Sequence, residues 1–313
     1  MRHVNLGDSG DVHSLEADQV VSAIERACES DLRTALRLVA RYSAYWWSNG
    51  LQDEAAAAAE RVLSMLGRTV PVGLDEEYLL AVIHGAASAE QEQVELAQQI
   101  VLTTTGPFRY SITVLLWSLV FGPFEPADVV EDVLNRNEAG DAWTRAAVEL
   151  CRGYPGLTAA APDDAAQSLR TALGRFRMLD DPWGLFLVLT ALRQVVDDPL
   201  DVTTEALELA EQLGLVEQTA LLLCERADLY RSQGKLEDAH ADYNRALSIG
   251  EDADLLETVA AARIGLARAA RHSGNLPTAR THLSAVLTLP NLEDAHFEAL
   301  HELGVLNASE ASA

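Results

Sequence analysis

Residues 234–246 read GKLEDAHADYNRA, and the glycine is followed at offsets 5, 9 and 12 by Ala239, Tyr243 and Ala246. Residues at these offsets lie on one face of an α-helix. A glycine ahead of them can adopt the positive φ of the turn that ends a preceding helix. The segment therefore predicts a tight turn followed by a helix whose small alanines allow a neighbouring helix to approach closely.

The same spacing occurs in two further places. The copies are Gly50 with Ala55, Ala59 and Val62, and Gly274 with Ala279, Leu283 and Val286. Upstream of two of the glycines, the facing stripe of the first helix is marked by Ala227 and Tyr230 and by Ala267 and Ala270. Such a helix–turn–helix hairpin buries its apolar face only by stacking on its neighbours, so the pattern predicts a repeat protein.

Apolar periodicity and turn residues divide the rest of the chain into further helix pairs. The predicted pairs are 32–48 with 52–66, 75–87 with 90–103, 109–121 with 127–135, 141–152 with 163–178, and 183–196 with 200–213. The predicted fold is all-α: a right-handed superhelical solenoid of about seven hairpins with a terminal capping helix at 292–303.

The predicted repeat domain covers residues 18–306 and begins with a helix at 18–28. A polar, flexible N-terminus at 1–17 and a frayed tail at 307–313 flank it. The longest breaks, at 67–73 and 154–162, are interpreted as bends or mild subdomain boundaries.

The order of small and aromatic residues resembles the tetratricopeptide repeat family. That family places a small residue and an aromatic in its first helix, then alanine, an aromatic and alanine in its second. The residues that match are Ala227, Tyr230, Ala239, Tyr243 and Ala246. Because Gly234 and Gly274 are 40 residues apart, against about 34 in the standard repeat, armadillo or HEAT repeats remain an alternative.

Composition excludes several classes of protein. The formal net charge is −25 and the only lysine is Lys235, whereas a nucleic-acid reader needs a basic surface. The apolar run 112–121 is too short for a membrane span, and the polar N-terminus is no signal peptide. The cysteines Cys28, Cys151 and Cys224 have no disulfide spacing. These features predict a cytoplasmic protein that binds neither nucleic acid directly nor a membrane.

The sequence carries no recognisable catalytic motif. A phosphate-binding P-loop needs GxxxxGK followed by Ser or Thr, and the single lysine does not occur in one. His296 and His301 are five residues apart and diverge on a helix, so they lack metal-ligand spacing. The acidic pairs at 163–164, 180–181 and 197–198 precede predicted helices, where carboxylates act as caps. We therefore expect no enzyme, no cofactor and no metal site.

The segment RYSAYWWSNG, residues 41–50, is unusually aromatic. Trp46 aligns with Tyr230 and is expected in the core, so Tyr45 and Trp47 face elsewhere: toward a partner, or under the helix at 18–28. A Trp-Trp pair before a glycine turn and an alanine-rich helix resembles the start of the repeat region in actinobacterial antibiotic regulators of the AfsR (SARP) type and in large LuxR-type regulators. That resemblance implies the sensor part of a transcriptional regulator.

In tetratricopeptide repeats, the positions that face a ligand lie on the first helix of each hairpin. Carried over to this chain, the resemblance gives the candidate residues Arg37, Trp47, Cys224, Asp228, Arg231, Arg268, Arg271 and His272. Arg231, Arg268 and Arg271 would form a basic stripe able to bind carboxylates of a peptide. The alternative is that these arginines pair with neighbouring Asp and Glu.

The predicted function is a non-catalytic protein-interaction or sensor domain, with a protein or peptide as its partner. The alternative function is a receptor for a peptide or a small molecule, which would need an enclosed groove rich in asparagine and aromatic residues.

Overall fold

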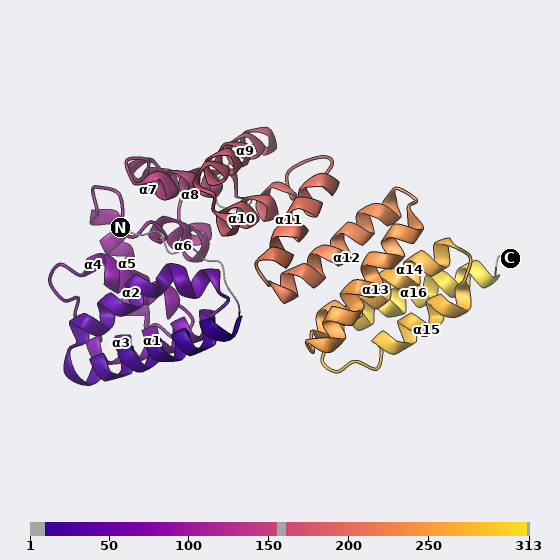
Figure 1. The fold of residues 1–313 in the computed structure, drawn as a ribbon, viewed down its shortest axis with the longest axis horizontal. Coiled ribbons are helices and arrows are strands. Elements are labelled where there is room, and N and C mark those ends of the chain that lie inside the picture. Colours follow the sequence, from indigo (N-terminus) through magenta and orange to yellow (C-terminus); the bar gives the residue numbers. More distant parts are fainter. Residues whose placement is uncertain (1–9, 155–160, 312–313) are drawn as a thin grey trace. The chain divides into compact units, whose positions relative to one another are not determined.

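The computed structural model describes residues 10–154 and 161–311 (Figure 1). Within these residues the chain forms sixteen α-helices, one short 3-10 helix and no strand. The all-α prediction is therefore confirmed, as expected for a chain rich in alanine and leucine, which are strong helix formers.

The α-helices are between 8 and 21 residues long. In chain order they are α1 (Gly10–Ser30), α2 (Leu32–Ser48), α3 (Gln52–Leu66), α4 (Asp75–His84), α5 (Gln91–Thr103), α6 (Thr113–Val120), η1 (Gly122–Phe124), α7 (Ala127–Asn137), α8 (Ala142–Gly153), α9 (Pro162–Leu179), α10 (Pro182–Leu192), α11 (Leu200–Gln212), α12 (Val216–Ser232), α13 (Leu236–Asp252), α14 (Leu256–His272), α15 (Leu276–Val286) and α16 (Glu293–Ala311).

The chain divides into two compact units, residues 1–196 and 197–313. The division therefore separates the predicted hairpin 183–196 with 200–213. Helix α10 belongs to the first unit, whereas α11 belongs to the second unit and packs on α12. Of the two predicted breaks, 154–162 lies partly outside the described residues.

The other predicted break, 67–73, is tied into the first unit. The Tyr78 hydroxyl donates to the Gly67 carbonyl at 3.1 Å, and the Gln93 side-chain amide donates to the same carbonyl at 3.2 Å. Because α4 and α5 both hold this connection, it is a fixed turn within the unit.

The core of the first unit is built from aromatic and aliphatic side chains on successive helices. Helix α2 packs on α1, α3 and α4, and α8 packs on α9. Trp46 is fully buried, which confirms its predicted core position. The apolar run at 112–121 forms α6, whose Val114, Leu116 and Trp117 are buried.

The helix predicted at 109–121 begins only at Thr113. The backbone N–H groups of Arg109 and Tyr110 donate to the carboxylate of Glu76 at 2.8 and 2.9 Å, and the Thr113 hydroxyl donates to it at 2.8 Å. A buried carboxylate on α4 thus accepts the backbone N–H groups of residues 109 and 110 ahead of the first turn of α6. Sequence periodicity carries no signal of this long-range anchor.

The three repeat turns have the predicted conformation. Gly50, Gly234 and Gly274 have φ values of 71°, 76° and 74°, a region that favours glycine. The nine residues at the repeated offsets are all buried: Ala55, Ala59, Val62, Ala239, Tyr243, Ala246, Ala279, Leu283 and Val286. The repeat pattern read from the sequence is confirmed in both its turns and its core face.

The second unit stacks helices in the order predicted for a repeat array. Helix α12 packs on α13 and α14, and α14 packs on α15 and α16. A Cβ atom at Gly265 of α14 would lie 2.1 Å from the Tyr243 ring of α13. Helix α16 closes the apolar core with Ala299 and Leu306, as expected of the predicted capping helix.

Helix extends into both predicted polar ends of the chain. Helix α1 begins at Gly10 and α16 ends at Ala311, whereas residues 1–9 and 312–313 lie outside the described residues. The flexibility of residues 1–17 and 307–313 stays a prediction.

We expect the stability of the first unit to fall between pH 7 and pH 5 because of His84. Burial lowers the pKa of His84 to about 4, from 6.5 for an ordinary histidine. The unfolded chain then binds the proton more tightly than the folded chain. The contribution of His84 is fully present above pH 6.5 and is lost as the pH falls toward 4, by up to about 2 kcal/mol at pH 5.

Urea denaturation followed by tryptophan fluorescence at pH 7 and pH 5 measures this effect. His84→Gln should flatten the pH dependence, because glutamine keeps a donor toward the Ser43 hydroxyl, which lies 2.9 Å from the ring nitrogen. His301→Gln, at an exposed position, serves as the control and should leave the dependence intact. A wild-type protein equally stable at both pH values would contradict the prediction.

Candidate partner-binding face

The eight residues predicted to meet a partner fall in both units. Arg37 is exposed and Trp47 is half-buried, and both lie on α2 of the first unit. The remaining six lie on α12 and α14 of the second unit. The second unit therefore holds most of the predicted positions on two neighbouring helices.

The outward stripes of α12 and α14 form what we call the first-helix face. Its members are Glu217, Leu221, Asp228 and Ser232 on α12, and Glu257, Ala261, Arg268 and His272 on α14. Each α14 residue follows its α12 counterpart by 40 residues, and each set has helical spacing along one side. All eight residues are exposed or half-buried, so the repeat presents them on one surface.

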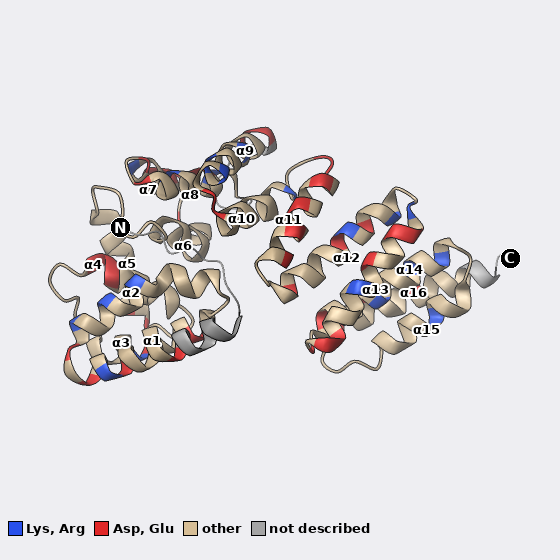
Figure 2. Ribbon diagram, in the orientation of Figure 1, with Lys and Arg blue, Asp and Glu red and all other residues tan. Residues whose placement is uncertain are grey.

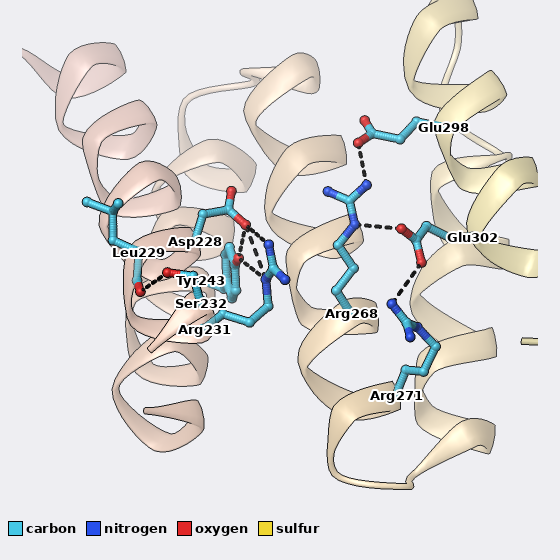
Figure 3. Close-up of polar contacts among 9 residues, drawn as sticks. All are labelled: Asp228, Leu229, Arg231, Ser232, Tyr243, Arg268, Arg271, Glu298 and Glu302. Carbon is cyan, nitrogen blue, oxygen red and sulfur yellow. Dashed lines mark hydrogen bonds and ion pairs between the residues drawn. The ribbon is translucent and has the colours of Figure 1, made fainter. Parts of the chain in front are cut away.

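Arg231 is held by a carboxylate of its own helix. Its guanidinium donates to Asp228 at 2.7 Å, and the Tyr243 hydroxyl of α13 donates to the same carboxylate oxygen, also at 2.7 Å (Figure 3). Burial raises the pKa of Tyr243, which keeps its hydroxyl protonated as a donor. The three side chains join the two helices of one hairpin.

Arg268 and Arg271 are held by carboxylates of α16. Arg268 donates to Glu298 and Glu302 of α16, each at 2.7 Å, and a guanidinium nitrogen of Arg271 lies 3.6 Å from Glu302 (Figure 3). Glu302 is buried. Pairing with neighbouring carboxylates, one of the two alternatives left open by the sequence, is what the structure contains.

These ion pairs change the charge that the first-helix face presents. The side chain of Asp228 is 48% exposed and its partner Arg231 is 21% exposed. Glu298 is 46% exposed and its partner Arg268 is 25% exposed. In these two pairs the carboxylate is about twice as accessible as the arginine, whereas Glu302 is 10% exposed, less than its partners Arg268 at 25% and Arg271 at 27%. In Figure 2 the Lys and Arg residues of α12–α14 are short, separated segments, with Asp and Glu beside them. Among the residues that define the face, three are carboxylates, Glu217, Asp228 and Glu257, and one is an arginine, Arg268, so the face is acidic in character.

Cys224 is placed differently from the other candidates. It is buried, and burial together with nearby Asp228 raises the pKa of its thiol to about 12. A buried, protonated thiol is inert and out of reach of a partner. Its contribution in this structure is to packing between helices.

Three residues that bond to Asp228 or Arg268 of the face were not among the sequence candidates: Tyr243, Glu298 and Glu302. Tyr243 was assigned only to the core, and its ring is indeed buried. Glu298 and Glu302 are four residues apart on α16, which places them on one side of that helix. This spacing was a usable signal, but the side that faces α14 depends on tertiary packing.

The described residues contain no group of three or more His, Cys, Asp or Glu side chains placed to hold a metal ion. Within the same residues, no helix combines the length and hydropathy that crossing a bilayer requires. A cavity of about 240 Å³ lies between the ends of α13, α14 and α15, where Glu251 pairs with Arg263 at 2.7 Å. It is smaller than the roughly 300–1,000 Å³ of typical small-molecule sites.

Comparison with protein-family models and with curated proteins finds no match. Among solved structures, the chain is similar to the signal transduction ATPase with numerous domains (STAND) protein with a tetratricopeptide repeat sensor from Pyrococcus horikoshii. The TM-score is 0.57 at 13% sequence identity, over 98% of this chain and 54% of that one. This chain thus spans about half of that protein. The likeness favours the tetratricopeptide interpretation over the armadillo or HEAT alternative, and we conclude that the chain has a tetratricopeptide-like, all-helical repeat fold.

Proposed function

We propose that this chain is a non-catalytic sensor or interaction domain that binds a protein or peptide partner through the first-helix face of the second unit. The observation that carries the proposal is the pairing pattern on that face. Arg231, Arg268 and Arg271 are each paired with a carboxylate, and in the Arg231–Asp228 and Arg268–Glu298 pairs the carboxylate is the more exposed member. A face built in this way attracts positive charge.

The favoured partner is therefore a protein segment with Lys and Arg side chains. The chain has a net charge of −25, which steers a basic partner toward it over distances of about a Debye length. Glu217 and Glu257 extend the face beyond the ion pairs, and both are exposed. They offer carboxylates to bidentate arginine contacts.

The biological setting we propose is a bacterial transcriptional control system. Two observations support it: the Trp-Trp segment at 46–47, which resembles repeat regions of AfsR-type and large LuxR-type regulators, and the fold shared with a STAND protein that carries a tetratricopeptide repeat sensor. In this proposal the chain is the sensor, and DNA binding belongs to its partner or to another part of the system.

The alternative of a small-molecule receptor has less support. The cavity between α13, α14 and α15 is below the usual size for such sites. An extended peptide needs an open face rather than a cavity, so a peptide partner is compatible with the first-helix face.

Reversing the charge of Glu217 and Glu257 to lysine is expected to weaken partner binding by at least about tenfold, since two attractive contacts become repulsive. The measurement is affinity capture from the native host with quantitative mass spectrometry, followed by titration of the captured protein. Glu237→Lys with Asp238→Lys on α13 makes the same charge change at exposed positions of a second helix and should bind normally.

Equal recovery by both double variants would refute the first-helix face as the binding site. Recovery of no protein, with a metabolite raising the melting temperature instead, would favour the receptor alternative.

A mobility-shift assay tests the proposed transcriptional setting. The chain alone should not shift DNA, whereas the captured partner should. A partner with no role at DNA would contradict the transcriptional setting but leave the binding face standing.

A further inference from the structure

Helix α16 has a second apolar side that the structure leaves uncovered. Its inner side carries Ala299 and Leu306, which are buried against α14 and α15. On its outer side Phe297 is 76% exposed and Leu300 is 57% exposed. The cap of a repeat array normally has a polar outer face, so this pair of large apolar side chains requires an explanation.

Gly304 lies on the same outer side, and nothing among the residues that the structure describes accounts for it. Its φ is not positive, and a Cβ atom there would meet no heavy atom within 4 Å. Glycine inside a helix is less favourable than alanine. A helical glycine without an internal reason is expected where another backbone or a large side chain approaches closely.

The spacing of these residues is self-complementary. Consider the point on α16 midway between Leu300 and His301. Phe297 lies before this point and Gly304 lies after it, at equal distances along the sequence. If two α16 helices pack antiparallel about a twofold axis at that midpoint, each Phe297 ring meets the partner's open Gly304 position. Leu300 then opposes His301 of the other copy, and both lie beside the axis. A twofold interface needs such a surface, because the same patch serves both partners.

The polar residues at the two ends of α16 fit the same arrangement. Asp294 is exposed near the start of the helix. In the antiparallel pair it would oppose Asn307 of the other copy, which accepts a hydrogen bond from Arg280 at 2.9 Å. An acidic residue thus approaches a position beside an arginine. A parallel arrangement would instead place the acidic starts of both helices together.

We propose that two copies of this chain associate through α16, with Phe297 of each copy packed over Gly304 of the other. Large aromatic side chains dominate interfaces of this kind. The proposal concerns α16 and is independent of the first-helix face, so a partner could bind that face on each copy.

Sedimentation analysis of the whole chain over a concentration series tests the proposal. The wild-type chain should show a monomer–dimer equilibrium, and Phe297→Ser should weaken it by at least about tenfold. Phe124→Ser removes a side chain that is 84% exposed in the first unit and should leave the equilibrium unchanged. Gly304→Leu should also weaken the dimer without lowering helix content, because leucine favours a helix.

Disulfide cross-linking tests where the proposed twofold axis crosses α16. Leu300→Cys should give an intermolecular disulfide under mild oxidation, whereas Met178→Cys, at an 81% exposed position in the first unit, should not. Cys28, Cys151 and Cys224 are buried and should not compete. A monomeric wild-type chain at all concentrations would overturn the proposal, and so would a dimer that Phe297→Ser leaves equally tight. A Leu300→Cys variant that dimerises without cross-linking would overturn the antiparallel register.

Discussion

Replacing Glu76 with alanine is expected to destabilise the first unit by about 3–5 kcal/mol. The Glu76 carboxylate is buried and accepts the backbone N–H groups of Arg109 and Tyr110 and the hydroxyl of Thr113. Alanine would leave these donors without their acceptor, and the segment before α6 would keep the bonds that Arg109 and the Tyr110 hydroxyl make to Glu77. The loss exceeds that of an ordinary surface ion pair, because Glu76 and Thr113 are buried and the Thr113 hydroxyl would lose its acceptor away from water.

Urea denaturation followed by tryptophan fluorescence measures this loss, since all five tryptophans lie in residues 1–196. Asp75→Ala provides the matched control. Asp75 is the adjacent residue in the first turn of α4 but is exposed, so its removal should cost at most about 1 kcal/mol. If the two variants lost similar stability, Glu76 would not be the anchor of residues 109–113.

Replacing Gly265 with alanine is expected to destabilise the second unit by about 2–3 kcal/mol. The added Cβ would lie 2.1 Å from Cε1 of Tyr243, far inside van der Waals contact. The Tyr243 ring cannot simply move away, because it is fully buried and its hydroxyl is bonded to Asp228. The expected result is a separation of α13 from α14 and a weaker repeat stack.

Gly304→Ala is the control for Gly265→Ala. Both glycines lie inside helices, but Gly304 has no neighbour within 4 Å, so alanine there should stabilise the monomeric fold by about 0.5–1 kcal/mol. Far-UV circular dichroism follows the unfolding of both units, whereas tryptophan fluorescence follows the unfolding of the first unit alone. Gly265→Ala should shift only the circular dichroism transition. A stabilised Gly265→Ala protein would show that α13 and α14 are not packed as described.

Much of the helix order could be predicted because its signals are local. The predicted helices 32–48 and 52–66 coincide with α2 and α3, since Gly50 marks the turn between them. The offsets after Gly234 correctly identified the core face of α13. These features depend on neighbouring residues in one helix and one turn, which sequence spacing describes directly.

Predictions failed where distant residues control the backbone. Residues 109–112 have helical periodicity, but the backbone N–H groups of Arg109 and Tyr110 donate to Glu76, more than 30 positions earlier. The pairing of 183–196 with 200–213 followed chain order, yet the two segments belong to different units. Adjacency along the chain does not reveal which neighbour a helix packs against.

The first-helix face also combines features that could be predicted from the sequence with features that only tertiary packing decided. The resemblance to tetratricopeptide repeats implied that Asp228 and Arg268 lie on the outer side of their helices, and the structure has them there. It could not choose between free and paired arginines, because the partners of Arg268 lie 30 and 34 residues away on α16. That these positions meet a partner stays a prediction.

The sequence by itself determined that this chain is helical, that its helices form turn-linked repeats, and which side of each repeat is buried. Those properties arise from residue spacing within one or two helical turns. Only the tertiary structure decided where the chain divides into units, which carboxylates hold the arginines, and which side of α16 remains uncovered. Each of these depends on contacts between residues far apart in the chain, whose energies become defined only after the helices have packed.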